Sequence, residues 1–504
     1  MKKTKKLKKV VALIGCITFA SNGIVFSASA MENGIQNEVV LGDNLNNVGS
    51  WTQANNYDIS WYNANQDNFI INNAQEFAGL SVLTNRLNGF ESVSFQGKQI
   101  MLTQDIDLSA HFWTPIGSTL NHSFKGEFNG NGHSIFRIKI NKKDEKDQGL
   151  FGYNSGTIKN IRLVDISIKG SNNIAGLAAN NTGTIKSIYI NGKIKGNDNV
   201  GGIVGSNFGT IESVDNKSKV TGHNYVGGIV GSKDMGMIKN SHNQGNIIGN
   251  ENTGGVAGSN NDDKIENSFN TGNLKGKSNV GGVVGYNSGS IEKNYNTGKI
   301  EGGSNVGGVV GRNLGSIEKI YNNGKIHGIE NNIGGVIGFN NGRMQNSFNT
   351  GEINGQNNVG GIIGFNKKIM KNSYNTGKVT GNKNIGGIFG AEEEYSWHID
   401  RGHCYYCGEV TADDVLWINE KIQATPVEDM KSLQFVETLG AAFAAPTTLN
   451  FNKGLPPLRC FVRDIVKTGF GNFNKTIRKF TLQTDQLKIL SNADNEIRVE
   501  DLQK

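Results

Sequence analysis

The sequence predicts an all-β protein, a right-handed parallel β-helix (a solenoid) of about nine or more coils with helical end caps. The first observation is a long string that occurs twice. Residues 278–293 read SNVGGVVGYNSGSIEK, and residues 304–319 read SNVGGVVGRNLGSIEK. A protein needs a catalytic loop only once, so a string that recurs almost unchanged is typical of a structural building unit.

The second observation is the constant spacing of the glycine pair in this string. Successive copies are 26 or 27 residues apart throughout the repeat region. The first residue of the pair falls at Ala175, Gly201, Gly227, Gly254, Gly281, Gly307, Gly334, Gly360 and Gly386. A period of this length indicates a solenoid, in which each unit contacts only its neighbours.

The third observation is the choice of residues, which favours strands over helices. Each unit carries short β-branched runs separated by Gly and Asn, and three strands are expected in it. In one copy these are 280–284, 291–295 and 299–300. No proline occurs between Pro115 and Pro426, as a continuous hydrogen-bonded ladder requires.

Stacking the coils about 4.8 Å apart would place like side chains over one another. Val280, Val306 and Ile333 should be one coil apart. A second aliphatic ladder is predicted from Ile211, Ile238, Ile265, Ile291, Ile317 and Met344. A corner ladder is predicted from Asn243, Asn270, Asn296, Asn322, Asn349 and Asn375, because Asn and Gly accept the left-handed backbone of a sharp corner and Asn can bond to its own backbone.

Exposed strand edges at the ends of such a stack need covering. Residues 31–148 are predicted to form an N-terminal capping region with an amphipathic helix that begins near Asn72. Phe77, Leu80, Leu83 and Leu87 lie near helical spacing, and Asn73 with Glu76 is placed as a capping box. The repeats occupy 149–390 and a C-terminal cap 391–462, in which 430–443 is expected to be helical. Residues 463–504 are a polar tail or a small appended segment.

The first 30 residues resemble a secretory signal peptide, with lysines, then an apolar run, then SASA before an expected cleavage after Ala30. Lipoprotein processing at Cys16 is an alternative. The leader carries six lysines and no acid, so the net charge of +7 falls to about +1 in the mature chain. No basic stripe for nucleic acid remains, and no later apolar run reaches the length of a transmembrane segment. The expected location is therefore secreted or at the cell surface.

The repeat unit NVGGVVGYNSGSIEKNYNTGKIEG resembles the GLUG-motif repeat of bacterial secreted and surface proteins. FKGEFNGNGHSI at 124–135, WTPIG at 113–117 and GLFGYNSGTIKNI at 149–161 are similar to the family's flanking strings, so the resemblance covers about residues 60–462. It implies a parallel β-helix of the kind found in the N-terminal, non-catalytic region of immunoglobulin-A-specific metallopeptidases. That enzyme class needs a His-Glu-x-x-His helix, and none of the eight histidines here precedes Glu. The resemblance therefore implies a structural role for the repeat residues.

The variable position after the third glycine of each unit is the candidate binding site. It reads Ser206, Ser232, Ser259, Tyr286, Arg312, Phe339 and Phe365. If this row points outward, Tyr286, Arg312, Phe339 and Phe365 form an aromatic and arginine strip suited to stacking on sugar rings or gripping a protein. If it points inward, the row is core.

Asp234, Asp262 and Asp263 occupy similar turn positions in adjacent coils, and they are the alternative site. Converging carboxylates on a β-helix can serve a polysaccharide lyase or hydrolase. Solvated corner residues are the structural explanation of the same pattern.

His403, Cys404 and Cys407, with His398, have a spacing that zinc ligands use. The alternative is a structural thiol or a disulfide among Cys404, Cys407 and Cys460, which an exported chain permits. No cofactor is expected, since Thr271 stands where a phosphate loop ending at Gly276-Lys277-Ser278 needs its first glycine.

The sequence therefore predicts a non-enzymatic adhesion or interaction scaffold whose partner is a surface glycan or an extracellular protein. Two alternatives remain open: a carbohydrate-active β-helix enzyme, and a non-catalytic accessory module of a surface protease system.

Overall fold

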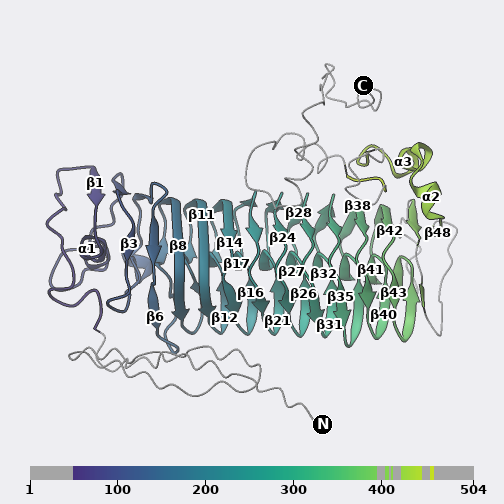
Figure 1. Ribbon diagram of the computed structural model, residues 1–504, viewed down its shortest axis with the longest axis horizontal. Helices are drawn as coiled ribbons and strands as arrows, with labels where there is room; N and C mark the ends of the chain where they lie inside the picture. The colour runs from purple at the N-terminus through teal and green to yellow at the C-terminus, as the bar shows by residue number, and fades with distance from the viewer. Residues whose placement is uncertain (1–48, 394–402, 408–409, 412–421, 445–454, 459–504) are drawn as a thin grey trace, which may run out of the picture. The chain divides into compact units, whose positions relative to one another are not determined.

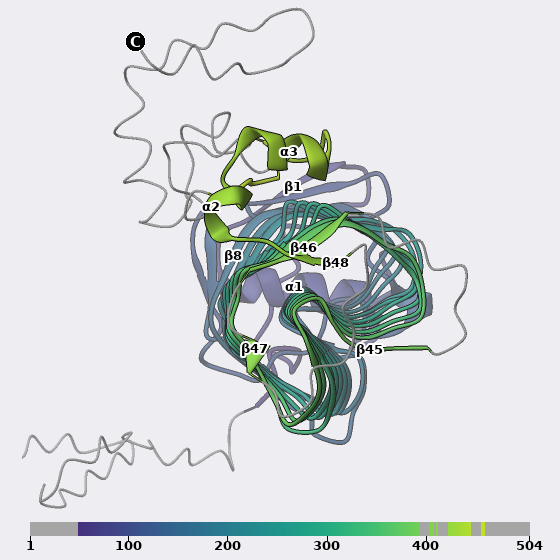
Figure 2. The same cartoon turned by 90° about the vertical axis from the view of Figure 1, so that its right-hand side faces the viewer.

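The computed structural model describes residues 49–393, 403–407, 410–411, 422–444 and 455–458. Their regular secondary structure is almost entirely short parallel strands, which stack coil upon coil into a β-solenoid of about 12 turns (Figure 1). The predicted fold class is confirmed. Viewed along the stack, successive coils superimpose in outline (Figure 2).

The strands form three sheets. The ten-stranded sheet contains β7 (Phe151–Asn154), β10 (Ala178–Asn181), β13 (Val204–Asn207), β17 (Val230–Lys233), β22 (Ala257–Asn260), β27 (Val284–Asn287), β32 (Val310–Asn313), β37 (Ile337–Asn340), β41 (Ile363–Asn366) and β45 (Phe389–Glu392). The nine-stranded sheet contains β9 (Ile174–Ala175), β12 (Asp198–Gly201), β16 (Asn224–Gly227), β21 (Glu251–Gly254), β26 (Ser278–Gly281), β31 (Ser304–Gly307), β36 (Asn331–Gly334), β40 (Asn357–Gly360) and β44 (Lys383–Gly386).

The third and largest sheet has 29 strands and runs from the first coil to the last. Its members are β1 (Asn68–Ile71), β2 (Gln99–Leu102), β3 (Ile106–Asp107), β4 (Glu127–Asn129), β5 (Ser134–Phe136), β6 (Lys139–Asn141), β8 (Thr157–Lys169), β11 (Thr184–Lys195), β14 (Thr210–Asn216), β15 (Lys219–Thr221), β18 (Ile238–Lys239), β19 (His242–Asn243), β20 (Ile247–Ile248), β23 (Lys264–Glu266), β24 (Phe269–Asn270), β25 (Leu274–Lys275), β28 (Ser290–Glu292), β29 (Tyr295–Asn296), β30 (Ile300–Gly302), β33 (Ser316–Glu318), β34 (Tyr321–Asn322), β35 (Ile326–Gly328), β38 (Arg343–Asn349), β39 (Ile353–Asn354), β42 (Met370–Asn375), β43 (Val379–Thr380), β46 (Cys404–Tyr406), β47 (Val410–Thr411) and β48 (Ile422–Ala424).

The predicted register between coils is confirmed. Val280 pairs with Val306, and Val306 pairs with Ile333, all in parallel strands. The aliphatic ladder that begins at Ile211 and ends at Met344 is in register at every step and fully buried or nearly so. Each coil therefore buries its apolar face against its two neighbours.

The glycine pair differs from the prediction, because the chain turns there and 280–284 is not one strand. A Cβ placed on Gly281 would lie 2.0 Å from the carbonyl oxygen of Val284, and one on Gly282 would lie 2.1 Å from that of Gly308. Only glycine fits between backbones at this distance. The turn splits the expected strand into β26 and β27, which lie in different sheets.

The corner ladder from Asn243 to Asn375 is confirmed by hydrogen bonds. Each side-chain Nδ2 donates to the Oδ1 of the Asn on the next coil, at 2.7–2.8 Å. The left-handed backbone, however, lies elsewhere in the coil. It occurs at two other positions of the repeat, for example at Asn279 with φ +51° and at Lys293 with φ +56°.

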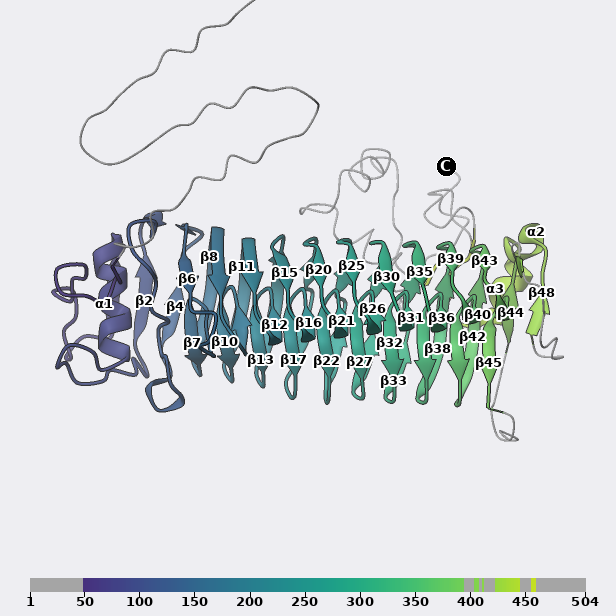
Figure 3. The same ribbon diagram turned by 90° about the horizontal axis from the view of Figure 1, so that it is seen from below.

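The N-terminal end is covered by α1 (Ala74–Thr84), which Figures 1 and 3 place at the start of the stack. Asn73 caps this helix by accepting the amide hydrogen of Glu76, and Glu76 in turn accepts from the backbone N–H of Asn72. Phe77 to Thr84 are all buried, so the helix is enclosed and is not the amphipathic plug that was predicted. Gly79 shows why, since its Cα faces the backbone of Asp58 with no room for a Cβ.

At the C-terminal end, the expected single helix over 430–443 is replaced by α2 (Val427–Met430) and α3 (Leu433–Leu439). Both lie on the outside of the last coils, next to β46 and β48 (Figure 2). Phe435, Val436 and Leu439 pack there on tyrosine and phenylalanine side chains of the largest sheet. The short 3-10 helix η2 (Leu120–His122) is the remaining helical element of the described residues.

Candidate functional site

The variable row is aligned coil by coil in the ten-stranded sheet. Ser259 pairs with Tyr286, Tyr286 with Arg312, Arg312 with Phe339, and Phe339 with Phe365. The row changes character along its length, because the three serines are buried whereas the four larger side chains are partly exposed. We call Tyr286, Arg312, Phe339 and Phe365 the strip.

The larger side chains of the strip stack on one another. The guanidinium carbon of Arg312 lies 5.2 Å from the ring centroid of Phe339. The rings of Phe339 and Phe365 are 5.7 Å apart and 3° from parallel, and Lys367 Nζ lies 5.8 Å from the Phe365 ring centroid. Among the described residues, the buried Nε of Arg312 has no hydrogen-bond partner. The strip therefore offers flat apolar faces beside a partly exposed cationic side chain.

Asp234, Asp262 and Asp263 do lie close together, around a residue that the sequence analysis overlooked. Lys233 is fully buried, and its Nζ donates to the main-chain oxygen of Asp262. Burial lowers the pKa of Lys233 to about 8, against the opposing attraction of Asp263, Asp262 and Asp234. The three acids thus surround a buried cation, which gives their clustering an electrostatic explanation.

The acids also have local bonds. Asp234 accepts from Ser232 Oγ at 3.3 Å and from Asn261 Nδ2 at 2.6 Å. Asp263 accepts the backbone N–H of Gly236 at 2.9 Å. These bonds hold the corners of two successive coils together. The sequence does mark Lys233 as unusual. It stands in SKDMG (232–236), at the position that is Asn in SNFG (206–209), YNSG (286–289) and RNLG (312–315).

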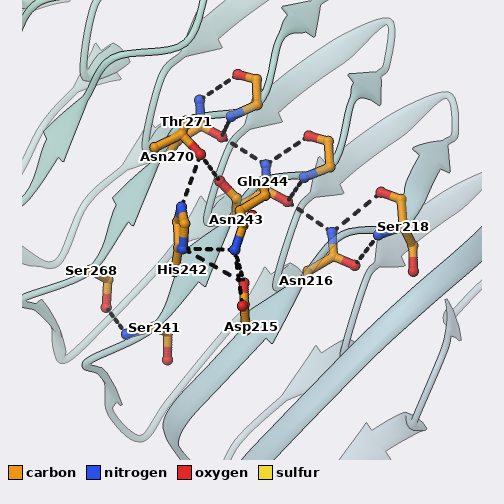
Figure 4. A network of polar contacts seen from close by, with 12 residues as sticks. Asp215, Asn216, Ser218, Ser241, His242, Asn243, Gln244, Ser268, Asn270 and Thr271 are labelled. Atoms are coloured by element: carbon orange, nitrogen blue, oxygen red, sulfur yellow. Dashed lines mark hydrogen bonds and ion pairs between the residues drawn. The ribbon is translucent and has the colours of Figure 1, made fainter. Parts of the chain in front are cut away.

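A second polar cluster, also missed, is centred on His242 (Figure 4). Asp215, His242 and Phe269 occupy one register on successive coils. The His242 ring stacks on Phe269 at 4.0 Å, and its Nε2 lies 2.9 Å from Thr271 Oγ1. Gln244 Nε2 donates to both carboxylate oxygens of Asp215 at 2.9 Å and lies 3.3 Å from His242 Nδ1.

This cluster has the residue types of a catalytic triad, but its hydrogen bonds favour a different role. Gln244 Nε2 bonds the Asp215 carboxylate, and Nδ1 of His242 lies 3.6 Å from Asp215 Oδ1, beyond hydrogen-bond distance. A catalytic triad has a direct hydrogen bond between its carboxylate and its imidazole, and the Gln244 amide occupies that position here. Burial lowers the pKa of His242 to about 3, and burial raises the pKa of Asp215. The cluster is a hydrogen-bonded end to a stacked column, and its imidazole is uncharged at neutral pH.

That column continues along the outside of the largest sheet. Phe269, Tyr295, Tyr321, Phe348 and Tyr374 stack in sequence at centroid distances of 4.5–5.1 Å. Near the C-terminal end it is covered by α3, where Phe435 contacts the rings of Tyr374 and Tyr405. At the C-terminal end, the aromatic residues of this column therefore bind the C-terminal cap through α3.

Cys404 is buried and Cys407 is partly exposed, and no disulfide bond joins them. Cys460 and His398 lie outside the described residues. Cys404 pairs in β46 with Ser373 of β42 and belongs to the core. Over the part of the chain that the structure describes, no group of three or more His, Cys, Asp or Glu side chains is arranged to hold a metal ion.

Comparison with known proteins gives two findings. Halomucin of Haloquadratum walsbyi is 30% identical over 114 residues, a match that covers 20% of this chain and 1% of halomucin. A solved structure from Bacteroides ovatus, described as a "putative immunoglobulin A1 protease", has 14% sequence identity and a TM-score of 0.28, and the alignment covers 78% of this chain and 92% of that one. No family model matches the chain. Within the described residues, no helix is both long and apolar enough to cross a bilayer.

Proposed function

We propose that this protein is an exported, non-enzymatic interaction scaffold that binds a surface glycan through the strip of Tyr286, Arg312, Phe339 and Phe365. The observation that carries the proposal is the pair of parallel, partly exposed phenyl rings of Phe339 and Phe365, with the guanidinium of Arg312 stacked on the first. Sugar rings stack on such faces, and a hydroxyl or carboxylate oxygen satisfies the guanidinium.

The coil spacing supports a repeated mode of binding. Each strip residue is one strand spacing, about 4.8 Å, from the next, so an extended chain lying along the stack would meet one side chain after another. Contacts that are weak one at a time add up through effective concentration. A location outside the cell is supported by the leader-like residues 1–30 and agrees with the partial match to halomucin.

The acids around Lys233 give less support to an enzyme. A glycosidase or lyase needs a carboxylate directed at substrate, whereas Asp234 and Asp263 are committed to corner hydrogen bonds. We therefore infer that the role of Asp234, Asp262 and Asp263 is electrostatic attraction to Lys233. Glycan turnover that disappears in the Asp262→Asn/Asp263→Asn double variant would contradict this inference.

The test is a binding screen of residues 31–504 against immobilised glycans and extracellular-matrix proteins, with the Arg312→Ala/Phe339→Ala variant alongside. Loss of two central contacts should weaken glycan binding about tenfold or more. The matched control is Phe208→Ala/Arg343→Ala, which removes the same residue types from exposed positions outside the strip. Binding only to a protein, or equal binding by both variants, would contradict the proposal.

A further inference from the structure

A second buried Asn ladder runs along the ten-stranded sheet, and Lys233 interrupts it. Its members are Asn154, Asn181, Asn207, Lys233, Asn260, Asn287, Asn313, Asn340 and Asn366. Wherever two Asn residues are consecutive in this ladder, the Nδ2 of the first donates to the Oδ1 of the second at 2.7–2.8 Å. Most of them also donate to the carbonyl oxygen two residues further along the chain.

At Lys233 an amine replaces the carboxamide that the other residues of the ladder carry. By the pattern of the other coils, the side chain at 233 should donate to the Oδ1 of Asn260, its partner in the next strand. Instead the Nζ of Lys233 donates to the main-chain oxygen of Asp262, two residues beyond Asn260. In the other coils, that same carbonyl position accepts from the ladder Asn. The amine therefore extends past the Asn260 carboxamide to a group that this carboxamide would otherwise bond.

The two side chains of the pair are buried, while Asp262 and Asp263 beside them are exposed. Lys233 and Asn260 are both 0% exposed. Asn260 Nδ2 still donates to Asn287 Oδ1, but Asn260 Oδ1 is buried without a hydrogen-bond partner among the described residues. A buried carboxamide with an unsatisfied oxygen is costly, and its strand partner here carries a buried amine.

We propose that Lys233 and Asn260 become joined by an intramolecular isopeptide bond. The Nζ lone pair attacks Cγ of Asn260, the Cγ–Nδ2 bond breaks, and Nδ2 leaves as ammonia. One Nζ proton is transferred to the leaving nitrogen, and the product is a secondary amide between Nζ and Cγ. The reaction is an amide exchange that needs no oxidant, metal or cofactor.

Two features of the corner favour this step. Burial lowers the pKa of Lys233 to about 8, so the neutral amine is roughly 300-fold more abundant near neutral pH than in an ordinary lysine. Asp263, whose charge acts on Lys233 more strongly than that of Asp262 or Asp234, is the carboxylate assigned to carry the proton between the two nitrogens. The burial of Lys233 and Asn260 limits the access of water to the tetrahedral intermediate.

The experiment is mass spectrometry of the purified exported chain after denaturation. The intact mass should be lower than the sequence mass by one ammonia, and trypsin should leave a branched peptide that joins the segments around Lys233 and Asn260. Trypsin should not cleave after Lys233, because its amine is acylated.

Three variants test the assignment. Lys233→Arg should restore the full mass, and Asn260→Asp should lose one water in place of ammonia. Lys239→Arg, a neighbouring lysine on β18, is the matched control and should keep the ammonia loss. A wild-type chain with its full sequence mass and normal cleavage after Lys233 would overturn the proposal. An ammonia loss that survives in Lys233→Arg would also overturn it, because it would arise from a succinimide at another asparagine.

Discussion

The corner ladder makes a sharp prediction about stability at Asn296. Its Oδ1 accepts from Asn270 Nδ2 at 2.7 Å and from the backbone N–H of Gly298 at 3.1 Å. Its Nδ2 donates to Asn322 Oδ1 at 2.8 Å and to the carbonyl oxygen of Gly298 at 2.9 Å. Asn296→Ala removes all four bonds in a site that is 0% exposed.

The expected cost is roughly 3–4 kcal/mol of unfolding free energy, at about 1 kcal/mol for each buried hydrogen bond that is lost. The matched control is Asn323→Ala. Asn323 occupies the next corner position on the following coil and is exposed, so its substitution should change stability by less than about 0.5 kcal/mol.

The measurement combines urea unfolding followed by circular dichroism with hydrogen exchange at the Gly298 amide. Long repeat arrays can unfold in more than one step, and the exchange rate reports the local loss even then. Equal unfolding midpoints for the two variants, together with unchanged exchange at Gly298, would refute the reasoning that the ladder stabilises the coils.

Three further predictions follow from the packing. Gly311→Ala should destabilise the chain by more than about 3 kcal/mol or prevent folding, because its Cβ would lie 2.4 Å from a backbone carbon of the preceding coil; soluble yield and thermal melting will check this. His242 has a pKa of about 3 when folded and about 6.5 when unfolded, so the unfolded chain binds more protons in that window and stability should fall as pH drops through it. His242→Phe should flatten this dependence in melts at different pH values. Phe435→Ala should expose the ring of Tyr405 and increase proteolysis of the C-terminal cap, with unchanged protection of the central coils.

Much of the fold could be predicted because aligning the repeats in the sequence also gives the register of their strands. Val280 aligns with Val306 in the sequence, and in a parallel stack aligned positions must also be neighbours in space. The corner ladder followed from the same logic. The turn at the glycine pair was not predicted, because β-branched residues such as Val283 and Val284 also suit an uninterrupted strand. Its cause is the close approach of backbones from different coils, which local preference does not encode.

The candidate site was predicted less completely. The strip emerged from one variable register, and the structure shows that it is partly exposed. His242 and Lys233 were overlooked because each is informative only as a departure from its register. His242 stands where later coils have Phe or Tyr, and Lys233 stands where they have Asn. The helix over 74–84 was predicted to be amphipathic, with one face exposed to solvent. That prediction was wrong because the chain at Asp58 packs against Gly79.

The parallel register between coils also has a consequence for how such a chain can change over generations. The strings at 278–293 and 304–319 are nearly identical, so recombination between their coding segments would add or delete one whole coil. Because β31 pairs with β26 and with β36 through the same register of its Val306 and Gly307, the new junction would be of a kind already present. The protein could thus lengthen or shorten in steps of about 4.8 Å without the invention of a new interface.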